Sequence, residues 1–168
     1  MLLNSKQIIQ LNERMLKETG LPLVSYFKSE KIKDGVISYG LSGAGYDVRL
    51  GTDIFIINDP NFVYDPKTKM DLEPYRVAPS ESVIIPPHSM MVAGIYEYFN
   101  MPNDVIGIVW GKSSYARGGL IANGMPLENS WAGYYTLSLI NSMSFSQVVY
   151  PLEGIAQVMF IQIEDGAD

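Results

Sequence analysis

Residues 111–120, with the sequence GKSSYARGGL, combine the chemical groups that bind phosphate. Hydroxyls donate hydrogen bonds to phosphate oxygens, cations neutralise their charge, and glycines let the backbone approach them closely. The spacing does not fit a Walker A loop, since three residues instead of four lie between the nearest preceding glycine and the Gly-Lys pair. We therefore predict a phosphate-binding turn, with an ordinary polar turn as the alternative. The side chains concerned are Lys112, Ser113, Ser114 and Arg117.

Residues 41–51, LSGAGYDVRLG, place an acid and a base close together on a predicted strand. Successive side chains of a strand point to opposite faces, so Asp47 and Arg49 lie on the same face. Two interpretations follow from these residue types. The two residues form a structural ion pair, or Asp47 meets a metal–phosphate complex through water.

Two further segments carry polar groups among apolar ones. Residues 123–133, NGMPLENSWAG, are typical of a hairpin and hold a carboxylate, Glu128, three residues before Trp131. Residues 154–160, GIAQVMF, have the pattern of an apolar strand interrupted by the amide of Gln157. Taken singly, each is compatible with a structural role: a surface charge beside a core aromatic residue, and an amide that faces solvent.

The composition excludes several kinds of chemistry. The chain of 168 residues has no cysteine and one histidine, His88, which rules out disulfides, Cys/His metal sites and zinc-dependent deamination. The net charge of −6 argues against nucleic-acid binding. No apolar run reaches the roughly 18 residues of a membrane span, and the N-terminus lacks a signal-peptide pattern. We therefore expect no membrane association and a cytoplasmic location.

Short β-strands must position most of these groups. Asn4 and Gln7 predict a capping box at the start of a helix, which Gly20 ends. After this helix, runs rich in Val, Ile, Tyr and Phe alternate with Gly, Pro, Asn and Asp, a pattern typical of an all-β barrel or sandwich. We predict one domain, residues 1–168, with strands over residues 46–50, 53–57, 82–85, 90–98, 105–110, 134–140 and 155–163.

Four segments, in this order, resemble the motifs of the dUTPase and dCTP deaminase superfamily: residues 42–51, 111–120, 127–133 and 154–157. The second is the most specific, because the deaminase branch carries a very similar Gly-basic-Ser-Ser-x-Ala-Arg run. Within that branch the chain resembles archaeal-type dUTPases. The resemblance implies a distorted, jelly-roll-like β-barrel with a short N-terminal helix. It also implies a homotrimer with active sites at the subunit interfaces, a deoxynucleoside triphosphate substrate and Mg²⁺.

The same resemblance assigns roles to residues around a bound nucleotide. Asp47 is implied to position Mg²⁺ through water, and Gln157 to support the segment that holds the phosphates. At the other end of the nucleotide, Trp131 is implied to lie against the deoxyribose, and Asn123 with the hairpin backbone to read the base edge. The substrate-binding residues of the phosphate segment are implied to be Lys112, Ser113, Ser114 and Arg117.

The choice between the two reactions of the superfamily depends on two carboxylate positions. For hydrolysis, the acid of the third motif activates the water that attacks the α-phosphorus while Mg²⁺ neutralises the departing diphosphate, and here this acid is Glu128. Deamination uses a further glutamate in a Leu-Glu-x-x-Asn run, where this chain has Ser138 in LSLIN. A serine hydroxyl does not exchange protons near neutral pH as a carboxylate does. We therefore predict a dUTP diphosphatase that hydrolyses dUTP to dUMP and diphosphate.

Two alternatives stay open. An active dCTP deaminase, alone or bifunctional, needs another carboxylate in place of the one missing at Ser138. The second alternative is a non-catalytic, nucleotide-binding regulatory trimer. It would explain why this chain has Glu128 where the superfamily usually has Asp. It also accounts for the short run of residues 164–168 after the last predicted strand, where the superfamily has a closing tail.

Overall fold

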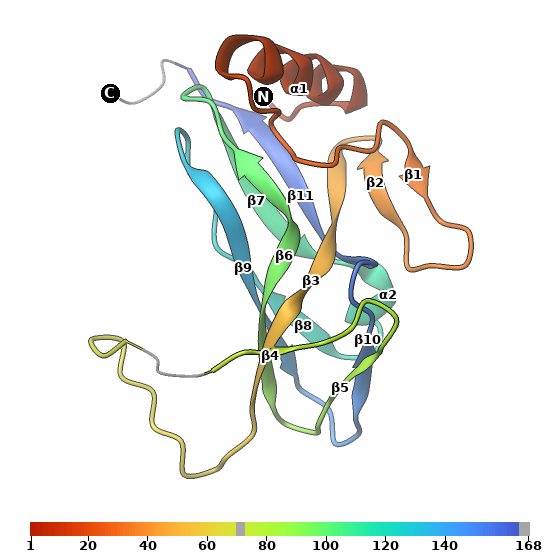
Figure 1. Cartoon of the computed structure of the whole chain (residues 1–168), viewed down its shortest axis with the longest axis vertical. Helices are drawn as coiled ribbons and strands as arrows, with labels where there is room; N and C mark the ends of the chain where they lie inside the picture. Colours follow the sequence, from red (N-terminus) through yellow and green to blue (C-terminus); the bar gives the residue numbers. More distant parts are fainter. Residues whose placement is uncertain (70–72, 165–168) are drawn as a thin grey trace.

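The structure is a computed structural model that describes residues 1–69 and 73–164, and its body is one curled sheet (Figure 1). In the described residues this sheet has nine strands, with the hydrogen-bonded order β1-β2-β3-β6-β9-β8. β11 adds to it by pairing with both β3 and β7, and β4 pairs with β3. Two other strands, β5 and β10, form a small separate sheet. The predicted mainly β architecture of the dUTPase-like type is therefore confirmed.

The elements have the following bounds. The helices are α1 (Ser5–Thr19) and α2 (Ser113–Ala116). The first strands are β1 (Lys31–Ile32), β2 (Tyr39–Ser42), β3 (Gly45–Ile57), β4 (Tyr75–Arg76), β5 (Val83–Ile85) and β6 (Met90–Asn100). The later strands are β7 (Val105–Gly111), β8 (Leu120–Asn123), β9 (Ala132–Asn141), β10 (Gln147–Val149) and β11 (Gly154–Gln162).

Helix α1 begins and ends where the sequence predicts. The backbone N–H of Asn4 donates to Gln7 Oε1 at 2.9 Å, and the N–H of Gln7 donates to Asn4 Oδ1 at 3.1 Å, which completes the capping box. Gly20 closes the helix with a φ of 78°, a conformation that favours glycine. The helix packs across one end of the sheet with a buried stripe of Ile8, Leu11 and Met15.

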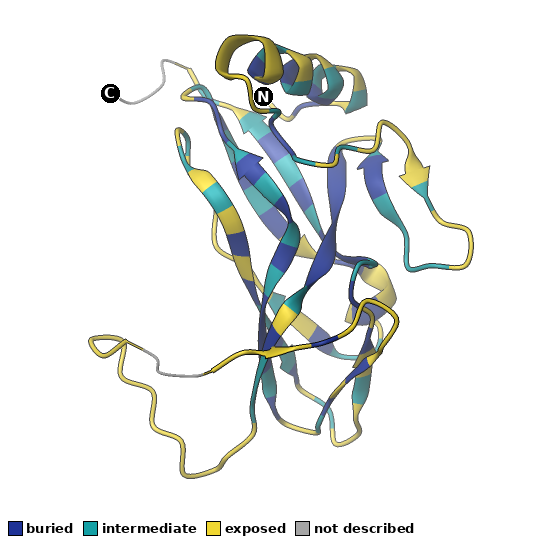
Figure 2. Ribbon diagram, in the orientation of Figure 1, coloured by how far each residue is buried: buried dark blue, intermediate teal, exposed yellow. Residues whose placement is uncertain are grey.

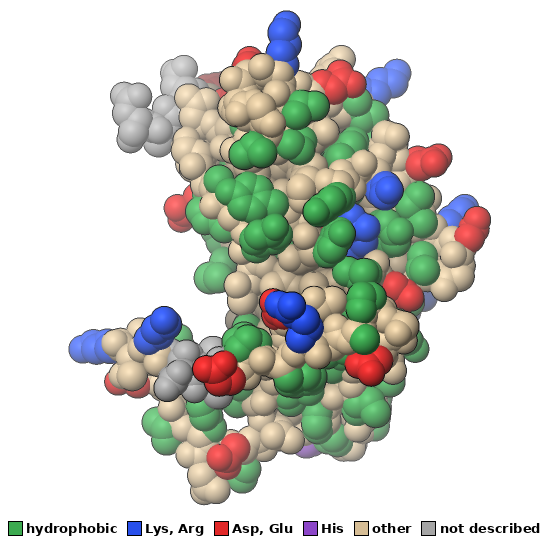
Figure 3. Space-filling model, in the orientation of Figure 1, with side chains coloured by type: hydrophobic (Ala, Val, Ile, Leu, Met, Phe, Trp, Pro, Cys, Tyr) green, Lys and Arg blue, Asp and Glu red, His purple; other side chains and the backbone are tan. Residues whose placement is uncertain are grey.

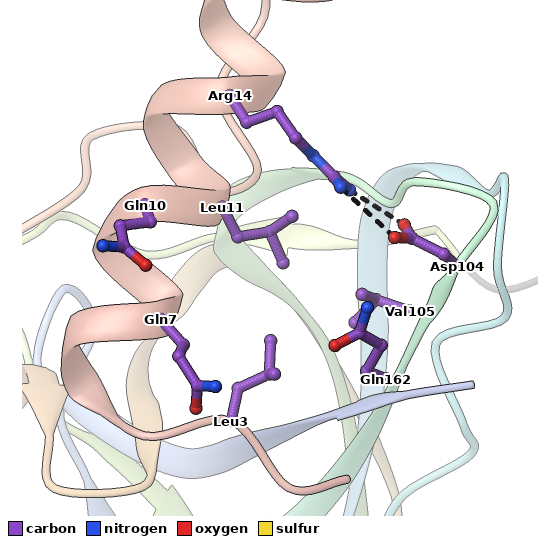
Figure 4. A pocket seen from close by; sticks show the side chains of 8 residues that line it. All are labelled: Leu3, Gln7, Gln10, Leu11, Arg14, Asp104, Val105 and Gln162. Carbon is purple, nitrogen blue, oxygen red and sulfur yellow. Dashed lines mark hydrogen bonds and ion pairs between the residues drawn. The ribbon is translucent and has the colours of Figure 1, made fainter. Parts of the chain in front are cut away.

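A pocket of about 240 Å³ lies between part of α1 and the neighbouring strands β7 and β11 (Figure 4). Arg14 spans its rim and donates to both carboxylate oxygens of Asp104, at 2.8 and 3.2 Å. This pair lowers the pKa of Asp104, chiefly through the hydrogen bond from Arg14. The contact fixes the helix to the turn between β6 and β7.

The predicted strands at residues 46–50 and 53–57 form a single strand, β3. Its register with β6 shifts between Leu50 and Ile54, so the chain bulges there and the strand continues. Gly51 makes the bulge possible, because a Cβ on it would collide with the carbonyl oxygen of Gly94 on β6. The sequence marks this glycine as a break, whereas the structure uses it to bend an unbroken strand.

Alternation along β9 shows how the sheet divides core from surface. Leu137 and Leu139 are fully buried, whereas Thr136 is exposed and Ser138 is half-buried on the opposite face. Buried and partly exposed residues also alternate along the later part of β6 and in β11, whereas residues 45–51 of β3 are all buried (Figure 2). The polar positions of β9 are therefore available to a ligand or a neighbouring chain.

Residues 58–69 leave the sheet as an exposed excursion and are the start of the connection from β3 to β4 (Figure 1). On the face drawn in Figure 3, hydrophobic side chains gather over the sheet around a hollowed middle. Among the described residues, no helix has the length and apolar character needed to cross a membrane. Residues 165–168, the end of the short tail considered above, lie outside the described residues.

Candidate active site

The phosphate-binding segment forms the short helix α2 and the turn after it, between β7 and β8. Tyr115 anchors this helix by its buried ring, and burial raises the pKa of its hydroxyl. Ser113, Ser114 and Arg117 are exposed, so three of the four predicted phosphate ligands reach the surface together. The fourth, Lys112, is buried and points elsewhere.

Lys112 makes an internal ion pair. Its Nζ lies 2.5 Å from Asp47 Oδ2, and Lys31 Nζ lies 3.1 Å from the same oxygen. Asp47 is only 2% exposed, so two ammonium groups screen it from solvent. Lys112 therefore acts within this chain as a structural partner of Asp47. Its predicted contact with substrate stays a prediction.

The predicted Mg²⁺ role of Asp47 does not fit this arrangement. A carboxylate oxygen that already forms ion pairs with two ammonium groups is a poor ligand for a further cation. Across residues 1–69 and 73–164, no group of three or more His, Asp and Glu side chains is placed to hold a metal ion. The binding of Mg²⁺ by the protein remains a prediction.

Arg49 is not the partner of Asp47, although the sequence places the two on one face. Its Nε donates to Glu97 Oε1 at 2.7 Å, and its backbone N–H donates to Glu97 Oε2 at 2.9 Å. The guanidinium also lies over the rings of Tyr39 and Tyr96, at 4.7 and 4.5 Å from their centres. Burial raises the pKa of Glu97, and the Arg49 guanidinium opposes that rise.

Gln157 lies at the centre of three strands, opposite Asp47 on β3 and Trp110 on β7. Its Nε2 donates to Ser42 Oγ at 2.9 Å, so within the chain it braces the first-motif turn. Its predicted contact with the phosphate segment is not among the hydrogen bonds of the described residues. Gln147 holds that segment instead, by donating from its amide to the carbonyl oxygen of Gly118.

Glu128 and Trp131 line one pocket of about 440 Å³. A turn places them there: Leu127 exchanges two backbone hydrogen bonds of 2.8 Å with Gly107, and the N–H of Trp131 donates to the carbonyl of Glu128 at 3.3 Å. The exposed carboxylate of Glu128 is the one acidic group in the lining. The lining residues are Met125, Pro126, Leu127, Glu128, Trp131, Tyr134, Tyr135 and Thr136.

Asn123 on β8 and Ser138 on β9 are direct partners in the antiparallel register. Asn123 is exposed, and Ser138, at the position where the deaminase branch has a glutamate, is half-buried on the face opposite Leu137 and Leu139. The structure thus brings together the predicted base-reading residue and the serine that replaces the glutamate.

The phosphate segment and the pocket at Glu128 are not in direct polar contact within the described residues. No hydrogen bond or ion pair of the described residues joins Glu128 to Ser113, Ser114 or Arg117. The homotrimer and the roles of these residues stay predictions.

A family model described as dCTP deaminase-like matches residues 23–163. The chain belongs to the dCTP deaminase-like family. Curated relatives include a dCTP deaminase from Acidobacterium capsulatum, which is 39% identical over 90% of this chain and 83% of that protein. A dCTP deaminase from Anaplasma phagocytophilum is 41% identical over 89% of this chain and 80% of that protein.

Solved structures agree on the fold of this dCTP deaminase-like protein. A dCTP deaminase from Agrobacterium tumefaciens superposes with a TM-score of 0.68 at 16% identity, over 97% of this chain but 48% of the other. The chain thus spans about half the length of that protein. The EIAV dUTPase superposes with a TM-score of 0.51 at 16% identity, over 86% of this chain and 92% of that protein. The resemblance to the dUTPase and dCTP deaminase superfamily is confirmed.

The predicted function, dUTP diphosphatase, is wrong. Relatives with 37–41% identity over 85–93% of this dCTP deaminase-like chain are named dCTP deaminases, which supports the alternative better. The four motifs do not distinguish hydrolysis from deamination, because enzymes of both kinds must bind a nucleoside triphosphate. The prediction gave too much weight to the single change at Ser138.

Proposed function

We propose that this protein binds dCTP and deaminates its cytosine, which yields dUTP and ammonia. The similarity to named dCTP deaminases along most of the chain carries this proposal. Two structural features support it: an exposed cluster of phosphate-binding groups on and after α2, and a pocket of about 440 Å³ at Glu128, within the size range of small-molecule sites.

The reaction requires proton transfers at the base. Water adds to C4 of the cytosine ring, the bond between C4 and the exocyclic nitrogen breaks, and ammonia leaves. A carboxylate can take the proton from water and return protons to the ring nitrogen and the leaving amine. Glu128 lines the pocket as its one acidic side chain, and we assign these transfers to it.

The rest of the nucleotide is divided between two surfaces. Ser113, Ser114 and Arg117 bind the triphosphate, and Trp131 packs against the deoxyribose. Asn123 donates to or accepts from the base edge beside Ser138. As the resemblance to the superfamily implies, we place the complete site between two copies of a homotrimer. The reaction leaves the phosphate chain intact, so the chemical step needs no protein-bound Mg²⁺.

Ser138 favours a second candidate function, the binding of dCTP without turnover. The hydroxyl at this position cannot replace a carboxylate in proton transfer, a contribution of about 100- to 10,000-fold in rate. If Glu128 does not reach the base, the chain retains a nucleotide site and loses the reaction. Such a protein responds to the concentration of dCTP instead of consuming it.

One experiment separates the two candidates. The purified protein is incubated with dCTP, ammonia and dUTP are measured, and dCTP binding is measured by calorimetry in parallel. Release of equal amounts of ammonia and dUTP supports deamination. Binding without either product supports the second candidate, and the absence of both binding and product contradicts both.

A further inference from the structure

The turn after α2 is held from outside by a neighbouring loop, residues 142–147. The amide of Gln147 donates to the carbonyl oxygen of Gly118. Ser142 Oγ donates to the carbonyl oxygen of Gly119 at 2.7 Å, and its backbone N–H points to the same oxygen at 3.4 Å. Two side chains thus fix two consecutive peptide groups immediately after Arg117.

The loop itself is anchored to the fold. Asn141 is 1% exposed, and its amide nitrogen lies within 3.1 Å of the carbonyl oxygens of Ile85, Pro86 and Phe145. Its Oδ1 accepts from the N–H of Met143 at 3.1 Å. Gln147 also belongs to β10, where it pairs with Ile85 on β5. The donors that reach the turn therefore start from a rigid base.

The turn has little freedom to adopt another shape. Gly119 has a φ of 83°, which disfavours residues with a side chain. A Cβ on Gly119 would lie 2.5 Å from Met143 Cγ, so the loop packs directly against it. A Cβ on Gly118 would lie 3.0 Å from Gln147 Oε1. The loop therefore packs so closely against the turn that neither glycine leaves room for a side chain.

We infer that Gln147 and Ser142 are positioning residues for the triphosphate. They fix the backbone that carries Arg117, so that its guanidinium and the hydroxyls of Ser113 and Ser114 point at the phosphates before the ligand arrives. An arginine on a fixed turn loses less conformational freedom when it binds. This inference rests on the proposed function only in requiring a nucleoside triphosphate as the ligand.

The test compares two ligands that differ in phosphate number. Calorimetry gives the dissociation constants of dCTP and dCMP for wild type, Gln147→Leu and Ser142→Ala. We expect each substitution to weaken dCTP on the order of 10-fold, as for the loss of one hydrogen bond, and to change dCMP less than twofold. Ser142→Thr keeps the hydroxyl and restores the wild-type ratio. Gln162→Leu, at an exposed glutamine far along β11, serves as the matched control.

The outcomes separate this inference from the proposed function. If both ligands weaken equally, or if only the melting temperature falls, Gln147 and Ser142 have a structural role and the inference is wrong. Ser142→Ala decides the matter if Gln147→Leu does not fold, because Ser142 is exposed. Inorganic tripolyphosphate is used as a third ligand. If wild type binds it and Ser142→Ala does not, the inference holds even when no ammonia is released. If wild type binds no triphosphate at all, the inference fails.

Discussion

Asn123 on β8 and Ser138 on β9 are direct partners in the antiparallel register, so their side chains lie side by side on one face of the sheet. This face is opposite to the buried side chains of Leu137 and Leu139. A group at position 138 can therefore reach the base edge that Asn123 is proposed to contact. Because Ser138 is only half-buried and faces away from the core, a longer side chain at this position does not enter the core.

Replacing Ser138 by Glu is expected to raise ammonia release from dCTP. The new carboxylate stands beside Asn123 and adds a proton-transfer group, which contributes about 100- to 10,000-fold when well placed. The initial rate of ammonia release is measured at saturating dCTP. Ser138→Gln has nearly the same shape without the acid, and we expect it to stay at the wild-type rate. An equal gain in both variants would show that size and not proton transfer is responsible.

Replacing Glu128 by Gln is expected to reduce ammonia release about 100-fold or more while the dissociation constant of dCTP changes little. The substitution removes the acid and keeps the side-chain length in the pocket. Glu13→Gln, at an exposed glutamate on α1, is the control for loss of one negative charge. Normal turnover by Glu128→Gln would remove Glu128 from the chemistry.

Lys112 and Arg117 are expected to behave differently, although both belong to the predicted phosphate segment. Lys112→Met leaves the buried Asp47 with one cation, so we expect a loss of roughly 2–4 kcal/mol in the free energy of unfolding and little change in dCTP affinity. Arg117→Ala removes an exposed cation, so affinity falls about 10-fold or more with little change in stability. Urea unfolding and calorimetry measure the two effects. The reverse pattern would return Lys112 to the binding site.

The Arg14–Asp104 pair predicts a pH-dependent part of stability. Because Arg14 lowers the folded-state pKa of Asp104 below its unfolded value of 3.8, this stabilisation is present above pH 3.8 and is lost as the pH falls through the folded pKa. Asp104→Asn should cost no more than about 1 kcal/mol near neutral pH, since solvent screens the partly exposed pair. Urea unfolding of both proteins from pH 7 to pH 3 checks this. A difference that grows toward acid pH would contradict it.

Local chemistry in the sequence was sufficient to predict some features. The capping box of Asn4 and Gln7 depends on residues three apart, and the strands follow from alternating apolar residues. The exposed serines and Arg117 follow from the residue types themselves. All of these features can be predicted from a residue's own type or from its neighbours along the chain.

Contacts between distant residues were not predictable in this way. Lys112 reaches Asp47 across 65 positions, and Arg49 finds Glu97 across 48. Gln147, which supports the turn after α2, lies ten residues before the glutamine that the motif favours. Nothing in the local sequence distinguishes Gln147 from any other polar residue of a short strand. Glu97 offered one signal, a charge within an apolar strand, which indicates a buried partner.

The most direct test of the proposed deamination is to incubate the protein with dCTP in water enriched in oxygen-18 and to examine the products by mass spectrometry. We expect dUTP that carries the heavy oxygen on its pyrimidine ring, with an equal amount of ammonia, because water adds at C4. Unchanged dCTP after prolonged incubation, or heavy oxygen found only on phosphate, would contradict it.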